Sequence, residues 1–477
     1  MRYKTGVDRK QISLLPTTLD DYIPEDHICR VIDSFTGLLD MAALGYKYAE
    51  CRSTGCRPYD PRMMLNLYIY GYLNKVRSSR RLEDETKRNV EVMWLIQDLK
   101  PDNRTICNFV KDNAKALKGT TREFAIMCRE LGLYGKELEA TDGMKVRANN
   151  ALKNNHNQIV VENELSRIDK KIEEYLKALE EGDKEEEEAG TPGSSEIRAA
   201  LERLKERREE VDELHKRVRE EGEVSTVDGE ARLMRTGGEG RKLDVCYNMQ
   251  VVADSKYHLI VDFEVTNCAN DSGNLYIMSE KAKNILEVKS FTNLADKGYY
   301  NGEAIAACEG NGVTCLVSKP RPGGAKKAKE FSHESFIYDR DKDLYVCPCR
   351  CLLPYMRNRK AGSGKEYRVY ANYSACGGCL RKAECTTYKY REILKLPYQD
   401  VLDAVEERTK KNKVLYHKRQ EIVEHIFGTI KAVWGYRQYL RRGKEKVSAE
   451  TALTCLAYNM RRVFNVYKEK GMRLAMV

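Results

Sequence analysis

The sequence predicts an α/β protein in which a mixed sheet flanked by helices carries two large insertions and follows an all-helical N-terminal region. Three observations support this fold class. Residues 1–135 contain helix start and stop signals without a strand pattern, whereas residues 246–318 begin with a strand hairpin and then alternate helix and strand. Residues 161–222 show coiled-coil spacing, and residues 319–400 gather cysteines, so both stretches interrupt the core.

Length and charge limit the classes of protein that fit. A chain of 477 residues has room for two or three domains, and 42% hydrophobic residues provide real cores. The formal net charge of +10 permits a nucleic-acid partner, although many soluble proteins carry such a charge without one. No apolar run approaches the roughly 18 residues of a membrane span. The first ten residues lack the apolar segment of a signal peptide, so we expect a cytoplasmic protein without a membrane partner, with mostly reduced cysteines.

Short helices joined by polar turns fill residues 1–135. Asp60-Pro61 is a helix start, with a capping residue followed by proline at the first position. The stretch Arg77–Arg88 begins with capping serines and carries four arginines, Arg80 and Arg81 among them. This pattern favours a helix-turn-helix-like DNA-binding domain, and the alternative is a plain helical bundle with solvated arginines.

The predicted core begins within residues 136–160, with a strand that ends at Asp142. Gly143 follows as a turn, and the basic residues Lys145 and Arg147 come close behind. A carboxylate that is fixed by a sheet and open to solvent suits a metal-held phosphate. An Asp-Gly pair alone is weak evidence, because most such pairs are ordinary turns.

Residues 161–222 are predicted to form an antiparallel coiled-coil hairpin. Apolar residues from Val161 to Leu179, and again from Ile197 to Val218, follow steps of three and four residues. The stretch Gly182–Ser195 breaks the pattern with acidic residues, glycine and proline, so we expect a mobile tip there. Its acidity would repel a phosphate backbone. We therefore interpret the hairpin as a dimer or spacer element, and the alternative is a solvated arm without a partner.

The core continues over residues 223–318. After a loop expected at 224–240, a hairpin of two strands is followed by helix, strand, helix and strand. The expected elements are Cys246–Ala253, Tyr257–Val265, Ser272–Glu287, Phe291–Asp296, Asn301–Gly310 and Val313–Ser318. This order is typical of a ribonuclease H-like core, and it places a second aspartate, Asp296, at the end of a strand.

The second insertion, residues 319–400, opens with a basic loop, Lys319–Lys329, which suits DNA or a solvated linker equally well. Six of the 16 cysteines then fall within residues 347–385. Cys376 and Cys379 form the tight knuckle that a tetrahedral thiolate site needs, and Cys385 follows. The earlier group offers Cys347, Cys349 and Cys351 as candidates. We favour a structural zinc-ribbon-like element, and the alternative is a loop with free thiols.

The last segment, residues 401–477, is predicted to add helices to the core. One of them carries Glu424, with Lys431 two turns further along the same side. Tyr416 and Arg419 precede Glu424 on this helix, and Glu421 is a reserve acid that lies nearly a full turn from Glu424.

Four motifs together resemble the signature of a known family. They are Thr-Asp-Gly-x-Lys-x-Arg-Ala-Asn at 141–149, Tyr-Asn-x-Gln at 247–250, Ala-Asp-x-Gly-Tyr-Tyr at 295–300 and Val-Glu-His-x-Phe-Gly-x-Ile-Lys at 423–431. In combination they are similar to the catalytic stretches of bacterial insertion-sequence transposases of the DDE class. The closest group is the IS eleven-eighty-two group, and the similarity runs from about residue 15 to residue 464.

The resemblance implies a ribonuclease H-like enzyme that binds terminal inverted repeats, cuts double-stranded DNA at the transposon ends and joins them to target DNA, as a homodimer in the synaptic complex. Asp142 would bridge two Mg²⁺ ions (with Mn²⁺ as an alternative), and Asp296 and Glu424 would each hold one. The DNA-binding residues would be Tyr416, Arg419, Lys431, Lys145, Arg147, Arg80 and Arg81. Relatives resemble the chain at Tyr-x-Cys-Pro, which favours Cys347, Cys376, Cys379 and Cys385 as the zinc ligands.

One departure concerns Arg419, because four residues separate it from Glu424 where the strict family signature has three. This puts the role of Arg419 in doubt more than that of Glu424. Two other functions remain as alternatives: a ribonuclease H-like nuclease without strand transfer, and an inactive or co-opted DNA-binding protein. The intact set of three acids argues against the second.

Overall fold

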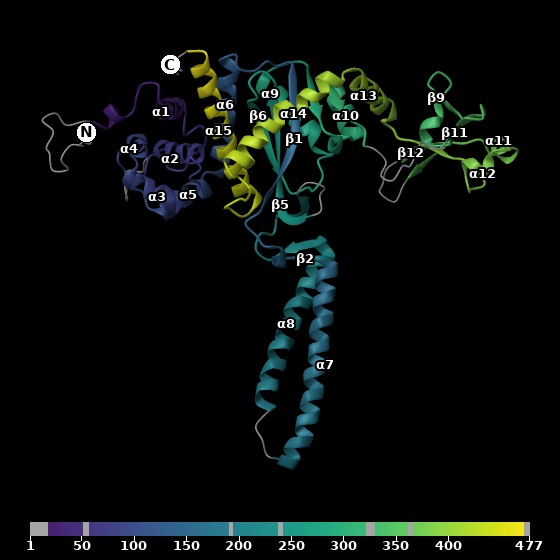
Figure 1. Ribbon diagram of the computed structural model, residues 1–477, viewed down its shortest axis with the longest axis horizontal. Coiled ribbons are helices and arrows are strands. Elements are labelled where there is room, and N and C mark those ends of the chain that lie inside the picture. The colour runs from purple at the N-terminus through teal and green to yellow at the C-terminus, as the bar shows by residue number, and fades with distance from the viewer. Residues whose placement is uncertain are drawn as a thin grey trace, which may run out of the picture.

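The computed structural model describes residues 18–50, 57–189, 194–236, 242–320, 330–360 and 366–471. The N-terminal helices lie at one end of the molecule, next to a central sheet, and a small cysteine-rich unit lies at the other end (Figure 1). A long helical hairpin projects from the middle, away from both.

The N-terminal region is entirely helical within its described residues. Its elements are η1 (Leu19–Tyr22), α1 (Ile28–Leu38), α2 (Pro61–Leu73), α3 (Ser79–Arg88), α4 (Val90–Leu95), α5 (Asn103–Asp112) and α6 (Ala114–Glu130). The expected start of α2 is confirmed, since the Asp60 carboxylate accepts a hydrogen bond from the Arg62 amide at 2.8 Å. Asp102 caps α5 in the same way, through the Thr105 amide at 2.6 Å.

These helices share one hydrophobic core with α15 (Lys444–Glu469), the last helix of the chain. Helices α2, α5 and α6 all pack against α15. The hydroxyl of Thr121 in α6 donates to the backbone carbonyl of Ala452 in α15 at 3.1 Å. The N-terminal helices are therefore joined to the C-terminal end of the chain by buried contacts.

The arginine side chains at the start of α3 differ in burial. Arg77 forms an ion pair with the fully buried Glu450 of α15 at 3.1 Å, and its guanidinium lies over the ring of Tyr436. Arg80 and Arg81 are exposed. Of these three arginines, Arg80 and Arg81 are therefore the ones open to a ligand.

The central sheet has six strands: β1 (Leu138–Arg147), β4 (Arg232–Thr236), β5 (Lys242–Asp254), β6 (Ile260–Thr266), β7 (Phe291–Ala295) and β8 (Val313–Val317). β5 pairs antiparallel with β1 on one side, and with β4 and β6 on the other. β1, β7 and β8 run parallel to one another. The resulting order, β6–β5–β1–β7–β8, is a mixed α/β topology that is compatible with a ribonuclease H-like core.

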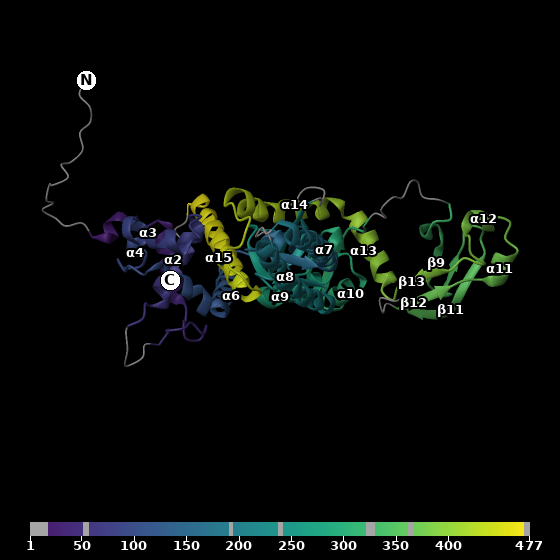
Figure 2. The same ribbon diagram turned by 90° about the horizontal axis from the view of Figure 1, so that it is seen from below.

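Helices cover both faces of this sheet. α14 (Lys413–Phe427) crosses one face, while α9 (Asn274–Leu286) and α10 (Gly302–Gly310) lie on the other (Figure 2). α13 (Gln399–Lys411) packs against β8 and α10, and a π-helical turn, η6 (Gly428–Val433), continues α14. Every strand and helix expected between residues 246 and 318 is therefore present, with small shifts at the ends.

Part of the loop expected at 224–240 is instead strand. β3 (Glu223–Ser225) pairs with β2 (Asn155–Asn157) as a short stem, and β4 adds to the edge of β5. The Glu223 carboxylate accepts hydrogen bonds from the Asn155 side chain and the Leu233 amide, so it joins the stem to β4. Strands as short as β2 and β3 have no sequence pattern of their own, because they form by pairing with a distant part of the chain.

The stem carries the projecting hairpin of α7 (Gln158–Ala189) and α8 (Ser194–Glu221) (Figure 1). The two helices run antiparallel and pack through an apolar cluster whose buried members include Val161, Ile168, Val211 and Val218. α7 continues seven residues beyond Gly182, where we expected it to break. Glu and Lys, which dominate that stretch, are good helix formers and outweigh a single glycine.

The cysteine-rich unit is a separate five-stranded antiparallel sheet. It contains β9 (Ile337–Asp339), β10 (Leu344–Val346), β11 (Leu352–Lys360), β12 (Glu366–Tyr370) and β13 (Ile393–Lys395), with η5 (His333–Ser335) and the short helices α11 (Tyr373–Gly377) and α12 (Lys382–Cys385). Its core contains five buried side chains: Phe336, Tyr345, Leu353, Tyr370 and Ile393. Most of the basic loop predicted at 319–329 lies outside the described residues.

Candidate active site

The predicted strand end at Asp142 and turn at Gly143 are wrong, because pairing with β5 continues β1 through both residues to Arg147. Asp142 lies where β1 extends beyond its parallel neighbour. β7 pairs with β1 only as far as Thr141, opposite Ala295, so Asp142 is the first residue past that pairing. One oxygen of its carboxylate accepts from the Gly143 amide at 2.8 Å, and the other from the Arg419 guanidinium at 2.9 Å. Burial raises the pKa of Asp142 to about 6, against the opposing effect of Arg419. The anion is therefore costly here and favours a cation beside it.

Asp296 follows β7 directly and caps the short helix η4 (Lys297–Tyr299). Its carboxylate accepts from the Gly298 amide at 2.6 Å. The negative charges of Asp296 and of a third aspartate, Asp271, add to burial in raising the pKa of Asp142. The structure thus brings the two predicted aspartates into one electrostatic environment at the same edge of the sheet.

Helix α14 lies across β1 and places Arg419 against Asp142. Ile422, Val423 and Ile426 are buried beneath the helix, and Arg419 is on the same side. Glu424 comes five residues later, about 140° around an α-helix from Arg419. Its side chain is exposed, and no donor or cation among the described residues pairs with its carboxylate. Sequence reasoning doubted Arg419 more than Glu424, whereas the structure joins Arg419 to the aspartates and leaves Glu424 facing outward.

No hydrogen bond or ion pair among the described residues joins Tyr416 or Lys431 to Asp142. Tyr416 is half-buried against the core, and Lys431 is exposed in the π-helical turn η6. Glu421, the reserve acid, acts on a different group: its charge opposes the lowering of the His258 pKa by burial and by Arg462.

Asp271, between β6 and α9, was not predicted. One of its carboxylate oxygens accepts from the side-chain amides of Asn248 at 2.7 Å and Gln250 at 2.6 Å. Gln250 is held in turn by the hydroxyl of Tyr299, which donates to its side-chain oxygen. Asn248 and Gln250 belong to the Tyr-Asn-x-Gln motif, so their amides were the available signal, but a single sequence does not reveal which acid they bind.

Two family models match the chain. One is described as "Transposase domain (DUF772)" and matches residues 17–112, and the other is described as "Transposase DDE domain" and matches residues 346–464. The chain belongs to the DDE-class insertion-sequence transposases. No curated protein and no solved structure matches.

Membership explains the chemistry of the site. A DDE transposase cleaves DNA and transfers the cut strand, and DDE transposase domains typically use divalent metal ions. Arg419, Glu424 and Lys431 lie within the second match, whereas Asp142 and Asp296 lie between the two matches. Within the described residues, no helix of this transposase combines the length and apolarity needed to cross a bilayer.

Three of the cations predicted to bind DNA gather near one strand end of the transposase. Lys145, Arg147 and Lys431 all lower the pKa of the Cys246 thiol, against the larger effect of burial. Lys145 donates to the carbonyl of Arg235 at 3.2 Å. Lys145 and Arg147 belong to β1, shortly after Asp142, and Lys431 belongs to η6.

All six cysteines of the second insertion line one cavity of about 30 Å³. The set therefore contains the four predicted zinc ligands, Cys347, Cys376, Cys379 and Cys385, together with Cys349 and Cys351. The amide of Cys351 donates to the Cys347 sulfur at 3.2 Å. Residues from two strand ends and two short helices thus line the same cavity.

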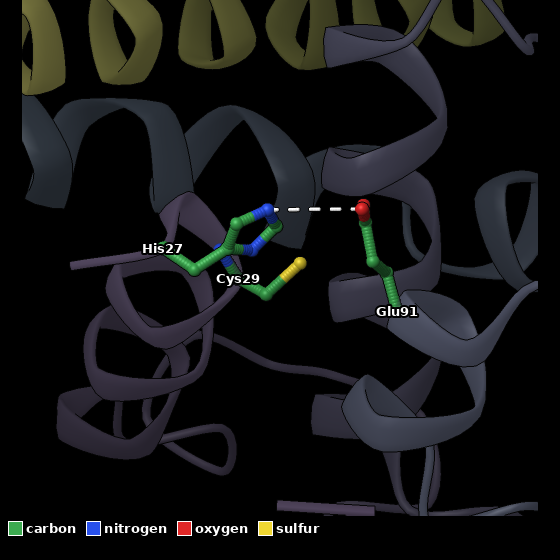
Figure 3. A group of neighbouring side chains, drawn as sticks. All are labelled: His27, Cys29 and Glu91. Atoms are coloured by element: carbon green, nitrogen blue, oxygen red, sulfur yellow. Dashed lines mark hydrogen bonds and ion pairs between the residues drawn. The ribbon is translucent and has the colours of Figure 1, made fainter. Parts of the chain in front are cut away.

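A second group of potential ligands lies among the N-terminal helices. Ligand atoms of His27, Cys29 and Glu91 lie within 4.8 Å of one another (Figure 3). The His27 ring accepts from the Cys29 amide to cap α1, and Glu91 accepts from the Tyr70 hydroxyl at 2.7 Å. Burial raises the pKa of Cys29 to about 12, so it is a neutral thiol. His27 and Glu91 are thus already bonded to other protein groups, and their contacts join α1 to α2 and α4.

Proposed function

We propose that this transposase carries out DNA cleavage and strand transfer at the sheet edge beside Asp142 and Asp296. The observation that carries the proposal is the position of these two carboxylates on neighbouring parallel strands: Asp142 is the first residue of β1 past the pairing with β7, and Asp296 follows β7 directly. Helix α14 supplies Arg419 from above this edge. We further propose a ribonuclease H-like core of the IS eleven-eighty-two group, which the strand order and the four sequence motifs support.

The residues present fit a divalent metal ion, which we propose to be Mg²⁺, with Mn²⁺ as a substitute and two ions in the complete site. The edge carries Asp142, Asp271 and Asp296 against the single guanidinium of Arg419. The buried side-chain oxygen of Asn248 has no hydrogen-bond donor in the described structure. When bound, the metal lowers the pKa of the attacking water or 3′-hydroxyl and neutralises charge at the phosphate. Asp142 and Asp296 would hold it through carboxylate oxygens.

We propose Glu424 as the third acid of the family signature. It lies within the match to the DDE domain and on the helix that carries Arg419. The π-helical turn η6 begins only four residues later, at Gly428, and such turns mark places where a helix can change its winding. A rotation of α14 when DNA binds would turn Glu424 toward Asp142.

DNA contacts would be divided between two regions. Lys145, Arg147 and Lys431 would bind phosphates next to the site, with Tyr416 and Arg419 closer to the scissile bond. Arg80 and Arg81, exposed on α3, would bind the terminal repeats. For the homodimer of the synaptic complex, the hairpin supplies exposed apolar side chains that a second copy could cover, including Tyr175 and Leu176.

We propose that Cys347, Cys376, Cys379 and Cys385 hold one structural zinc. The convergence of thiols on one cavity supports a tetrahedral sulfur site. The hydrophobic cluster of the unit is also small, and units of this size commonly need a metal or disulfide to stay folded. No cysteine in the described structure forms a disulfide.

The proposed function is tested by cleavage of DNA that carries the ends of the element. Asp142→Asn, Asp296→Asn and Glu424→Gln each keep the shape of the side chain and remove its charge. Each is expected to abolish cleavage and to leave end binding nearly unchanged in a gel-shift titration. Cleavage at the wild-type rate by any one variant would remove that residue from the proposed site.

A further inference from the structure

Asp271 is a carboxylate without a basic partner. The ion pairs of the described residues include none for Asp271 or Asp296, and Asp142 has only Arg419. The two donors to Asp271 are neutral amides that bind the same oxygen, so its second oxygen accepts no hydrogen bond within the described structure. An anion fixed in this way beside two others is arranged to receive a cation from outside the chain.

The position of Asp271 is fixed by close packing on both sides of the sheet edge. A Cβ atom at Gly143 would lie 2.9 Å from one carboxylate oxygen of Asp271, and a Cβ atom at Gly298 would lie 3.4 Å from the other. The same Cβ atom at Gly298 would lie 2.8 Å from a carboxylate oxygen of Asp296. Asp271 therefore reaches from the α9 face of the sheet to the glycines that follow Asp142 and Asp296.

A second, independent feature is the buried side-chain oxygen of Asn248. Asn248 is fully buried, and its amide nitrogen donates to Asp271, yet its oxygen accepts no hydrogen bond from the described residues. This oxygen lies 2.9 Å from the position that a Cβ of Gly143 would take, on the same side as Asp271. Leaving a buried acceptor without a donor is unfavourable, and a bound cation would offset that cost.

We propose that Asp271, positioned by the side-chain amides of Asn248 and Gln250, is a further carboxylate ligand of the divalent ion at Asp142 and Asp296. Hard divalent cations take six or more oxygen ligands, and carboxylates together with amide oxygens are among their usual donors. The inference rests on the proposed function, since it adds a ligand to the same metal site. It assigns the Tyr-Asn-x-Gln motif the task of orienting that ligand.

The test is a titration of the full-length, metal-free protein with Mn²⁺, in which free Mn²⁺ is followed by electron paramagnetic resonance. Asp271→Asn keeps an oxygen that can accept from both amides and removes the charge. It is expected to weaken Mn²⁺ binding about tenfold to a hundredfold. Asp142→Asn serves as the reference for the proposed site, and Asp84→Asn, an exposed acid on α3, is the matched control that should bind as the wild type does.

The outcomes separate the two claims. If Asp142→Asn weakens Mn²⁺ binding while Asp271→Asn and Asp84→Asn match the wild type, the inference is overturned and the proposed function stands. If none of the three changes binding, the proposed metal site itself is overturned. If thermal melting shows that Asp271→Asn does not fold, Asn248→Ala replaces it. That change keeps the Asp271 carboxylate and removes one of its two hydrogen-bond donors. Unchanged Mn²⁺ affinity in a folded Asn248→Ala protein would also overturn the inference.

Discussion

Replacing Arg77 with alanine is expected to lower the free energy of unfolding by about 3 kcal/mol. This value is at the lower end of the cost of breaking a buried ion pair, because the Arg77 side chain keeps 19% of its surface exposed. The change leaves Glu450 fully buried without its cation and removes the guanidinium from the ring of Tyr436. Two backbone amides, of Leu440 and Arg441, still donate to Glu450 and limit the loss.

The loss is expected to depend on pH. Burial raises the pKa of Glu450 above its usual value, and Arg77 opposes that rise. Because the folded state holds the proton more tightly than the unfolded state, the contribution of Glu450 to stability falls as pH rises through its folded-state pKa. Without Arg77 this pKa rises further. The variant is therefore expected to lose more stability at pH 8 than at pH 5, because more of the buried Glu450 is in the charged form that needs a cation at the higher pH.

Urea unfolding followed by tryptophan fluorescence measures this effect. The two tryptophans of the chain are Trp94, in α4, and Trp434, which lies between η6 and α15, so both report on the unit that Arg77 holds together. Arg80→Ala, an exposed arginine three residues away, is the matched control and is expected to change stability by less than about 0.5 kcal/mol. A loss below about 1 kcal/mol for Arg77→Ala, or one that is equal at both pH values, would refute this account of the junction.

Three further changes test other parts of the structure. Replacing both Arg80 and Arg81 with alanine is expected to weaken binding to the terminal repeat in gel shifts at several salt concentrations. The slope of log affinity against log salt should fall by about 0.9 for each phosphate that the variant no longer binds. Cys376→Ser is expected to lose about one zinc per chain by elemental analysis, whereas exposed Cys107→Ser should keep it. Gly143→Ala is expected to cost about 1–3 kcal/mol in urea unfolding and to weaken Mn²⁺ binding, because its Cβ would collide with the side-chain amide of Gln250 and press on Asn248 and Asp271.

Each of these three expectations has a clear opposite. An unchanged salt slope would place end recognition outside α3, and zinc retained by Cys376→Ser would remove that residue from the metal site. Wild-type Mn²⁺ affinity in Gly143→Ala would mean that the metal ligands tolerate displacement of the Asp271 carboxylate.

The local features of the fold could be predicted from sequence because local chemistry determines them. Helix α2 begins at Pro61 as its capping aspartate and proline indicate, and β7 ends where Asp296 leaves the sheet. The strands of the core follow one another along the chain as predicted. Two of the proposed site residues, Asp142 and Asp296, come close because β7 ends opposite Thr141 of β1 and Asp296 follows it directly.

Other features could not be predicted because they depend on contacts between distant parts of the chain. Asp271 lies in a loop of ordinary polar composition, and only the amides of Asn248 and Gln250, more than 20 residues away, give it a fixed position. Arg77 resembles its neighbours Arg80 and Arg81 in sequence, yet its partner lies 373 residues further along the chain. The direction in which Glu424 faces depends on the rotation of α14 on the sheet, which helical spacing alone does not determine.

The most direct test of the central claim is metal rescue at Asp142. In the full-length protein, Asp142→Cys replaces a carboxylate oxygen with sulfur, which Mg²⁺ accepts poorly and Mn²⁺ accepts more readily. If Asp142 binds the metal during DNA cleavage, the variant is inactive in Mg²⁺ and regains part of its cleavage activity in Mn²⁺, while Asp142→Ala stays inactive in both. Equal loss of activity of Asp142→Cys in the two metals, or wild-type cleavage in Mg²⁺, would contradict the account.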